Sequence, residues 1–346
     1  SRRDFTINAL AIALPEVELV DPFGGLSDLA ARRIRAPISP EVSFSDDPLR
    51  MLRAVRFAST LDFALDPSVE AAVRAMHDRL AIVSRERVRD ELSKLMVGRA
   101  PSRGLDLATQ TGLAQELLPE LPALSLEQDP VHRHKDVFRH TLAVLDNVCA
   151  SDRGEPDLVL RLAAVLHDVG KPKTRQITPG GVSFHHHEVV GAEMAEARLR
   201  ELRYPSKVVA DVRELVHLHL RLHSYRLGWT DRAVRRYVRD AGHQLGRLNA
   251  LIRADCTTRN PRRARELARR VDDLEEWIRE LATREELGRM RPALDGHEIM
   301  AHLGIPPGPL VGEAYDLLME IRMDEGEIPK EEAYRRLDEW YGSRPG

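Results

Sequence analysis

Residues 44–57 read FSDDPLRMLRAVRF and predict the helix on which the rest of the fold is built. Ser45 or Asp46 is a suitable N-cap, the acids favour the positive end of a helix, and Pro48 suits the first turn. Four apolar residues then share one side of the helix, at Leu49, Leu52, Val55 and Phe57. The stretch therefore predicts an amphipathic helix whose arginines lie away from the core.

Asp47 and Arg50 are three positions apart, so both project from one face near the start of this helix. A carboxylate accepts a hydrogen bond from the exocyclic amino group of a base, and a guanidinium donates to the neighbouring ring nitrogen or carbonyl. Cytosine and adenine both present an amino group beside an acceptor nitrogen, whereas uracil and guanine do not. The pair therefore predicts a site that accepts C and A. An Asp–Arg pair that only caps a surface helix is the structural alternative.

The chain has 346 residues, enough for two or more domains with cores of their own. No apolar run approaches the length of a membrane span, and nothing in the sequence resembles a signal peptide. The two cysteines, Cys149 and Cys256, lie far apart and give no disulfide framework. We therefore expect a cytoplasmic protein without a membrane partner.

The net charge of −3 is unevenly distributed along the chain. Between Arg259 and Arg270 there are six arginines and one acid, Glu266, whereas the segment after Pro292 is acidic. A basic face on a nearly neutral protein favours a local polyanion site. An arginine-rich helix that simply faces solvent is the alternative.

Three short segments resemble a known family. Residues 2–9 read RRDFTINA, residues 21–25 read DPFGG, and residues 46–57 read DDPLRMLRAVRF. In this order they resemble the RRD motif, the DPFGG segment and the E/D-D-x-x-R motif of bacterial class II tRNA nucleotidyltransferases. That family contains the CCA-adding enzymes and the related bacterial poly(A) polymerases. The Gly24-Gly25 step either lets the backbone approach a ligand or forms a simple turn.

The resemblance implies a nucleotide-binding set made of Arg2, Arg3, Asp4, Asn8, Asp47 and Arg50. Asp4 would contact the ribose hydroxyls, and the two arginines before it would hold phosphate through charge-assisted hydrogen bonds. The Asp47–Arg50 pair would select CTP or ATP. Asp46 stands where the family usually has Glu, a change that shortens a supporting carboxylate.

The family's first motif combines a Gly-Ser phosphate grip with an Asp-x-Asp pair that binds Mg²⁺ for attack on the α-phosphate. This motif should precede Arg2, and no later segment of the chain supplies it. We therefore expect the sequence to be an N-terminally truncated piece of such an enzyme, inactive by itself in nucleotidyl transfer.

Residues 17–21 and 32–37 predict short strands, and residues 67–118 have a helical pattern throughout. Residues 84–92 read SRERVRDEL, with a Ser at the start and charges four positions apart. In the family this Arg/Glu-rich helix supports the nucleotide-selecting pair, which implies that Arg85, Arg87 or Arg89 contacts Asp47 or Arg50. A solvent-facing helix held by ion pairs is the alternative.

A histidine-rich region follows. His140 lies on a predicted amphipathic helix, and His167-Asp168 ends the helix predicted at residues 158–166, with Gly170 just beyond. Together with Asp255 these residues provide two imidazoles and two carboxylates. Such a set suits Mg²⁺, Mn²⁺, Fe²⁺ or Ni²⁺ better than a thiolate-preferring metal.

The order H…HD…D, with residues 165–172 reading VLHDVGKP, resembles the HD phosphohydrolase superfamily. The implied metal ligands are His140, His167, Asp168 and Asp255, with His187 and His219 as implied ligands of a second metal. Domains of this kind, when fused to CCA-adding enzymes, resemble metal-dependent phosphatases and 2′,3′-cyclic phosphodiesterases. Lys171 would either steady a phosphate or face solvent as an ordinary surface lysine.

The helix predicted at residues 261–281 is expected to lie along tRNA phosphates, which implies salt-sensitive RNA binding. Its implied RNA-binding residues are Arg262, Arg263, Arg269 and Arg270. Residues 294–312 resemble the family's C-terminal tRNA-facing segment, in which two short helices flank a Pro-Gly turn.

We therefore predict a mainly α fold. It would comprise a short α/β remnant of a nucleotidyltransferase head at residues 1–60, an all-α neck at 61–128, an HD domain at 129–275 and a tail at 276–346. The predicted function of the intact protein is addition of CCA to tRNA from CTP and ATP, without an obligate protein partner. The alternatives are addition of A alone or of poly(A), metal-dependent phosphohydrolysis by the HD domain, and RNA binding without catalysis.

Overall fold

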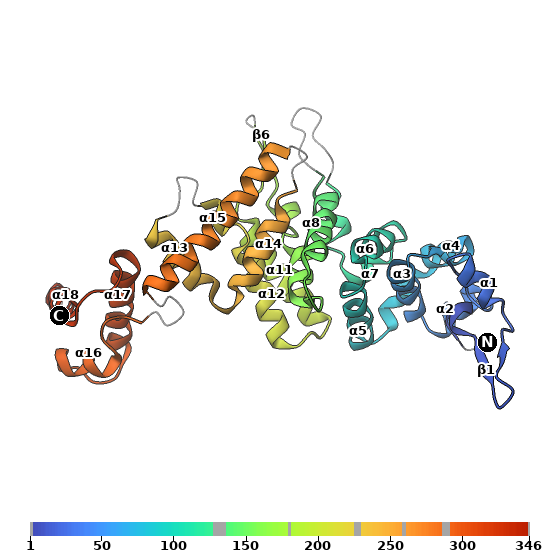
Figure 1. Ribbon diagram of the computed structural model, residues 1–346, viewed down its shortest axis with the longest axis horizontal. Coiled ribbons are helices and arrows are strands. Elements are labelled where there is room, and N and C mark those ends of the chain that lie inside the picture. Colours follow the sequence, from blue (N-terminus) through green and yellow to red (C-terminus); the bar gives the residue numbers. More distant parts are fainter. Residues whose placement is uncertain are drawn as a thin grey trace. The chain divides into compact units, whose positions relative to one another are not determined.

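The computed structural model describes residues 3–126, 136–178, 181–224, 230–257, 261–285 and 291–344. Helices make up most of these residues (Figure 1). The strands of the described part are short: β1 (Ala11–Ala13) pairs antiparallel with β2 (Glu18–Val20), β3 (Arg33–Ile34) pairs parallel with β4 (Ala64–Leu65), and β5 (Gln176–Thr178) pairs antiparallel with β6 (Gly181–Ser183). The prediction of a mainly α fold with a small α/β part is confirmed.

Two compact units make up the chain. The first comprises Ser1–Leu220 and Gly246–Asn260, and the second comprises Arg221–Leu245 and Pro261–Gly346. The first unit contains α1 (Gly25–Ala30), α2 (Pro40–Asp46), α3 (Leu49–Leu61), α4 (Pro67–Met76), α5 (Arg85–Met96), α6 (Pro101–Gln110), α7 (Ala114–Leu117), α8 (Val137–Ser151), α9 (Leu158–Leu166), α10 (Lys171–Thr174), α11 (His187–Glu201), α12 (Ser206–Leu218) and most of α14 (Leu245–Asp255). The second contains α13 (Asp231–Ala241), α15 (Pro261–Glu285), α16 (Gly296–Leu303), α17 (Pro309–Glu325) and α18 (Lys330–Gly342).

The helix predicted from residues 44–57 is two helices with a break between them. α2 begins after Ser39, whose hydroxyl accepts a hydrogen bond from the Val42 amide, and it runs through Asp46. α3 starts at Leu49, after Pro48. The prediction of Ser45 or Asp46 as the N-cap of α3 is therefore wrong, because Ser39 and Pro40 supply an earlier helix start that places both residues in the last turn of α2.

The apolar side predicted for α3 is its buried side. Leu49, Leu52 and Val55 are all at most 5% exposed. Phe57 is half-buried, and its ring meets the edge of Phe5 at a centroid distance of 5.8 Å. The helix thus packs by burying aliphatic side chains, as its sequence periodicity predicts.

The DPFGG segment forms a turn that starts α1. The Asp21 carboxylate accepts hydrogen bonds from the amides of Gly25 (2.7 Å) and Leu26 (3.0 Å), which caps the helix start. Gly24 has φ +73°, a left-handed conformation that glycine adopts readily. A Cβ on Gly25 would lie 2.3 Å from the Thr6 carbonyl oxygen. Both glycines are thus explained by the turn and its packing.

Arg161 ties the middle of α9 to the end of α5. This arginine is 4% exposed and donates to the carbonyl oxygens of Met96 (2.6 Å) and Gly98 (2.8 Å). It also donates to the Asp152 carboxylate at 2.5 Å. The last carbonyls of a helix lack partners within the helix, so Arg161 supplies bonds that the end of α5 needs. A buried charge is thereby paired.

The C-terminal helices have a small core of their own. Its buried members are Leu294, Ile299, Ala314, Leu318, Ala333 and Leu337. Asp295 and Glu298 form a capping box at the start of α16. The predicted pair of helices around the Pro-Gly turn is α16 and α17, and the second of them is longer than expected, with 17 residues. In the described part of the chain, no helix is both long and apolar enough to cross a membrane.

Replacing Arg161 with Met should destabilise the first unit by about 3–5 kcal/mol, because the Asp152 carboxylate and the end of α5 would lose their buried partner. The measurement is the urea unfolding midpoint followed by far-UV circular dichroism. The control is Arg139→Gln, which removes an ion pair to Asp106 from a side chain that is 59% exposed and should cost no more than about 1 kcal/mol. Equal effects of the two variants would contradict the role given to Arg161.

Candidate functional site

The nucleotide-selecting pair predicted from the sequence lies where α2 ends and α3 begins. The Asp47 carboxylate accepts hydrogen bonds from the Leu49 amide (3.2 Å) and from the Arg87 guanidinium of α5 (2.8 Å). Arg50 donates to the Ser43 hydroxyl at 2.9 Å. Both side chains are only partly exposed and are held from two sides. Such bonds restrict the side-chain conformations, as reading a base edge requires.

Of the three arginines predicted to support this pair, one contacts it. Arg87 binds Asp47, which confirms that part of the prediction. Arg85 instead pairs with Glu201 at 3.1 Å, and Arg89 donates to the Arg203 carbonyl oxygen at 2.8 Å. Those two arginines therefore join α5 to the end of α11 and the residues after it.

Asp4 is buried and surrounded by donors. Its Oδ1 accepts hydrogen bonds from the Phe5 amide (2.9 Å) and from the Asn8 side chain (3.0 Å). Its Oδ2 accepts two hydrogen bonds from Arg53, at 2.9 Å and 2.5 Å. Burial opposes its ionisation, but the hydrogen bonds from Asn8 and Arg53 lower the pKa of Asp4 below its usual value. The structure thus brings Asp4 and Asn8 together. Arg3 is exposed, and Arg2 lies outside the described residues.

Sequence reasoning missed Glu91, which links these elements. It is 2% exposed on α5 and binds Arg56 (2.7 Å) and Lys94 (2.9 Å), with Arg53 at 3.5 Å. Burial raises the pKa of this carboxyl, but its cationic neighbours outweigh burial and lower it. A charged residue in an Arg/Glu-rich helix gives no sign in the sequence that it is buried, so only the packing identifies it.

The predicted metal ligands come from five helices and meet in one buried cluster. His140 lies in the first turn of α8, His167 and Asp168 follow the last turn of α9, and Asp255 ends α14. His187 begins α11, and His219 directly follows α12. The ligand atoms of His140, His167 and Asp255 all lie within 4.8 Å of one another, and so do those of Asp168, His187 and His219.

Asp168 belongs to the second of these groups and also contacts the first. Its Oδ2 lies 3.3 Å from His167 Nε2 and 3.5 Å from His140 Nε2. Its Oδ1 lies 3.3 Å from His187 Nε2 and 3.9 Å from His219 Nε2. One carboxylate therefore presents each oxygen to a different pair of imidazoles, an arrangement that can bridge two cations.

The outer nitrogens of the imidazoles are all engaged, which leaves the inner nitrogens facing the cluster. Nδ1 of His167, His187 and His219 bonds the carbonyl oxygen three residues earlier, at 2.8, 2.7 and 2.6 Å. Nδ1 of His140 contacts the Thr257 hydroxyl at 2.7 Å. Donation by Nδ1 leaves the Nε2 lone pair for a metal. Nε2 of the first three is buried and has no hydrogen-bond partner among the described residues.

The charges in the cluster suit a divalent cation. Burial and the neighbouring His167 lower the pKa of His219 to about 3, so this imidazole is neutral near pH 7. Burial lowers the pKa of His167, but the adjacent Asp168 raises it by more. Burial also opposes ionisation of Asp168, yet its imidazole and Lys171 neighbours keep its pKa well below the usual range. Asp168 thus favours a proton on His167, and a divalent cation such as Mn²⁺, Fe²⁺ or Ni²⁺ would replace that proton when it bound, because imidazoles bind metals in their neutral form.

Gly170 and Lys171 complete the surroundings of Asp168. A Cβ on Gly170 would lie 2.2 Å from the His187 carbonyl oxygen, so a glycine is required for α11 to approach the His167-Asp168 turn. The Lys171 ammonium lies 2.6 Å from Asp168 Oδ2, and its side chain is only 20% exposed. Of the two alternatives for Lys171, an ordinary surface lysine is therefore wrong, because the short turn directs this side chain back onto the carboxylate.

The arginines predicted to bind RNA lie on α15 in the second unit. Arg262, Arg269 and Arg270 are exposed, and Arg270 pairs with Glu266 at 2.9 Å. The Arg263 side chain lies outside the described part of the structure. The helix itself extends over 25 residues, slightly longer than predicted.

Comparison with known families gives three matches along the chain. A poly(A) polymerase head domain matches residues 1–35, a probable RNA and SrmB-binding site of polymerase A matches residues 62–124, and an HD domain matches residues 137–294. These matches follow the order of the segments from which the resemblance was recognised.

Similar proteins are known over almost the whole chain. The A-adding tRNA nucleotidyltransferase of Deinococcus radiodurans is 38% identical, over 100% of this chain and 79% of its own length. The CC-adding tRNA nucleotidyltransferase of Thermus thermophilus is 37% identical, over 99% of this chain and 77% of its own length. The crystal structure of the Bacillus stearothermophilus CCA-adding enzyme in complex with CTP has a TM-score of 0.64 and 27% identity, over 99% of this chain and 74% of that chain.

Proposed function

Because the chain belongs to the family of tRNA nucleotidyltransferases and bacterial poly(A) polymerases, we propose that its protein adds C or A to the 3′ end of tRNA from CTP and ATP. The observation that carries this proposal is the Asp47–Arg50 pair, held by Arg87 and Ser43 at the start of α3. A fixed carboxylate and a fixed guanidinium three residues apart would together match the amino group and acceptor nitrogen that C and A share.

The same geometry supports roles for the neighbouring residues. Asp4 and Asn8 would contact the ribose, with Arg53 orienting the Asp4 carboxylate. Arg2 and Arg3 would hold phosphate, and Mg²⁺ would neutralise the developing charge when bound. Arg53 and Glu91 would act as positioning residues, because Arg53 contacts both the Asp4 carboxylate and the Glu91 carboxylate.

The choice between C, A and the full CCA sequence is a finer question. The similar proteins include an A-adding and a CC-adding enzyme, so membership of the family allows either. The Asp47–Arg50 pair fits both bases, and CCA addition remains our proposal for this chain. A tRNA substrate and two free cysteines suit a cytoplasmic location. The four parts at residues 1–60, 61–128, 129–275 and 276–346 are proposed as head, neck, HD domain and tail.

A second activity is favoured by the buried cluster of imidazoles and carboxylates. His140, His167, Asp168 and Asp255 would hold one divalent metal, and His187 and His219, with the second oxygen of Asp168, would hold another. The bound metal would polarise a phosphate ester and activate water for its hydrolysis. Lys171 would hold Asp168 in place and lend positive charge at the position of a substrate phosphate. Hydrolysis of a 2′,3′-cyclic phosphate or a phosphate monoester is the proposed reaction.

The exposed arginines of α15 are proposed to bind the tRNA backbone. Arg262, Arg263, Arg269 and Arg270 lie within three turns of one helix, a spacing that suits successive phosphates. Their contribution would be independent of sequence, because phosphate contacts position an RNA without reading its bases.

Asp47→Ala should weaken discrimination against UTP and GTP by roughly 5- to 150-fold, the equivalent of about 1–3 kcal/mol for one base-reading pair. The measurement is incorporation of each labelled nucleotide into tRNA that lacks its CCA end, by the full-length protein. The matched control is Asp62→Asn at the other end of α3, where φ is +58° and the side chain is 61% exposed. Unchanged nucleotide preference in Asp47→Ala would remove the basis of the proposal.

Asp168→Ala should lower hydrolysis of a 2′,3′-cyclic nucleotide with Mn²⁺ or Ni²⁺ by about 100-fold or more, since loss of a ligand should cost at least as much as loss of its outer partner. The metal content of the purified protein, measured by mass spectrometry, should fall as well. The control is Glu196→Gln on α11, an acid that pairs with Arg200 and Arg213 outside the cluster. Full metal content and activity in Asp168→Ala would exclude the cluster as the metal centre.

Changing Arg262, Arg269 and Arg270 together to Gln should weaken tRNA binding and reduce the slope of log K against log salt by about 2–3, if each arginine neutralises one phosphate. Filter binding between low and moderate salt measures both quantities. Arg335→Gln with Arg336→Gln is the control, because both arginines of α18 pair with Glu332. An unchanged salt slope in the α15 variant would show that this helix does not bind the backbone.

A further inference from the structure

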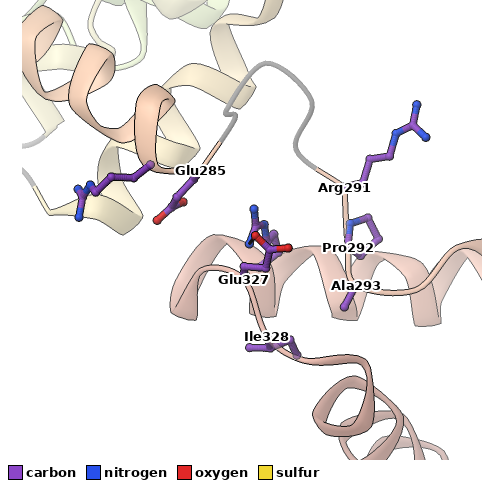
Figure 2. A pocket seen from close by; sticks show the side chains of 8 residues that line it. Glu285, Arg291, Pro292, Ala293, Glu327 and Ile328 are labelled. Carbon is purple, nitrogen blue, oxygen red and sulfur yellow. Dashed lines mark ion pairs between the residues drawn. The ribbon is translucent and has the colours of Figure 1, made fainter.

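A cavity of about 560 Å³ lies in the second unit, whereas the metal cluster and the Asp47–Arg50 pair belong to the first. Its walls come from the end of α15, from residues 291–293, from α17 and from the residues that follow α17 (Figure 2). This volume falls within the roughly 300–1,000 Å³ typical of small-molecule sites. Pro292, Ala293 and Ile328 give it an apolar edge.

A buried arginine that lines this cavity has two nitrogens without hydrogen bonds. Arg322 of α17 is 7% exposed, and its Nε and Nη1 have no hydrogen-bond partner among the described residues. A carboxylate oxygen of Glu327 lies 3.5 Å from Nη1, but that side chain is 81% exposed. Unsatisfied donors on a buried cation cost free energy. Both nitrogens are covered in this structure, so a ligand would reach them where the exposed Glu327 side chain moves away from Nη1, and it would then supply the missing acceptors.

Neither of the two carboxylates that line the cavity supplies the hydrogen-bond acceptors that Arg322 lacks. Glu285 accepts two hydrogen bonds from the buried Arg235, at 2.9 Å and 2.8 Å, so its charge is already compensated. Glu327 is mostly in solvent. Two further arginines also line the cavity: Arg291, and Arg284, which lies 3.4 Å from the Asp231 carboxylate. Cations therefore outnumber the acids that could neutralise them.

We propose that this cavity binds a phosphate group. A phosphate offers several acceptor oxygens to the fork of a guanidinium, and an arginine binds it through two parallel hydrogen bonds. The apolar edge leaves room for the rest of the ligand. The phosphate would come either from a small molecule such as a nucleotide or pyrophosphate, or from the backbone of an RNA strand. This inference stands without the nucleotidyl transfer and hydrolysis proposed above.

The direct test observes Arg322 itself. In protein labelled with ¹⁵N-arginine, the Nε–Hε signal of Arg322 is identified by its absence from Arg322→Lys, and inorganic pyrophosphate is titrated without divalent metal. The signal should shift saturably, and Arg284→Gln should weaken the apparent affinity by at least about threefold. Arg344→Gln, an arginine paired with Glu313 elsewhere in the same unit, should leave it unchanged.

A second arm identifies the source of the phosphate. If RNA is the ligand, Arg322→Gln should raise the tRNA Kd several-fold and lower its salt slope by about 0.7–0.9. If a small molecule is the ligand, pyrophosphate binding falls and tRNA binding is unchanged. Thermal unfolding of Arg322→Gln, and of Arg322→Lys, which keeps the charge, shows whether each variant remains folded. An Arg322 signal that responds to neither pyrophosphate nor tRNA overturns the proposal.

Discussion

A buried carboxylate stays ionised only where cations replace the water it has lost, and Glu91 of α5 meets this condition with Arg53, Arg56 and Lys94. Two of these cations belong to α3, so the same ion pairs that stabilise Glu91 fix α3 against α5. Arg53 carries the link onward to Asp4, and Arg87 of α5 binds Asp47. At its other end, α5 receives hydrogen bonds from Arg161 of α9, the helix that leads into His167 and Asp168. Helix α5 therefore holds in place both α3, where the proposed base-selecting residues lie, and α9, which leads into the metal cluster.

The two proposed sites differ in how far their charged groups are buried and in the kind of ligand that they favour. At the start of α3, the Asp47 carboxylate and the Arg50 guanidinium are each held by a neighbouring side chain and remain partly exposed, so their hydrogen-bonding groups are available to a base. In the cluster, five of the six side chains are buried and Asp255 is partly buried, and their ligand atoms lie close together, an arrangement that is stable with a cation among them. The first arrangement favours recognition of a neutral base edge. The second favours a positive ion that can draw electrons from a phosphate.

The sequence allowed the helices and much of the cluster to be predicted, because their signals are local or ordered along the chain. Helix α9 spans the residues predicted from its apolar run, and the implied metal ligands meet although they are spread over more than 100 positions. The predicted N-cap of α3 is wrong because two helix starts, after Ser39 and after Pro48, lie within ten residues of each other. Thr257, Glu91 and the buried Asp28, which binds Arg33 and Arg35, could not be foreseen. Their importance depends on which distant side chain or carbonyl they meet, and residue type alone does not specify that.

Gly170 also limits how the cluster can diverge among relatives. Its α-carbon is pressed against the main chain of α11, where an added methyl group would meet the His187 carbonyl oxygen at 2.2 Å and the Gly191 nitrogen at 2.7 Å. Contact between two backbones cannot be relieved by a smaller side chain nearby, as side-chain crowding often can. The distance between the His167-Asp168 turn and α11 is thus set by van der Waals contact between two main chains. A change of metal preference during evolution would therefore require exchange of the ligand residues, because the distance between this turn and α11 would stay the same.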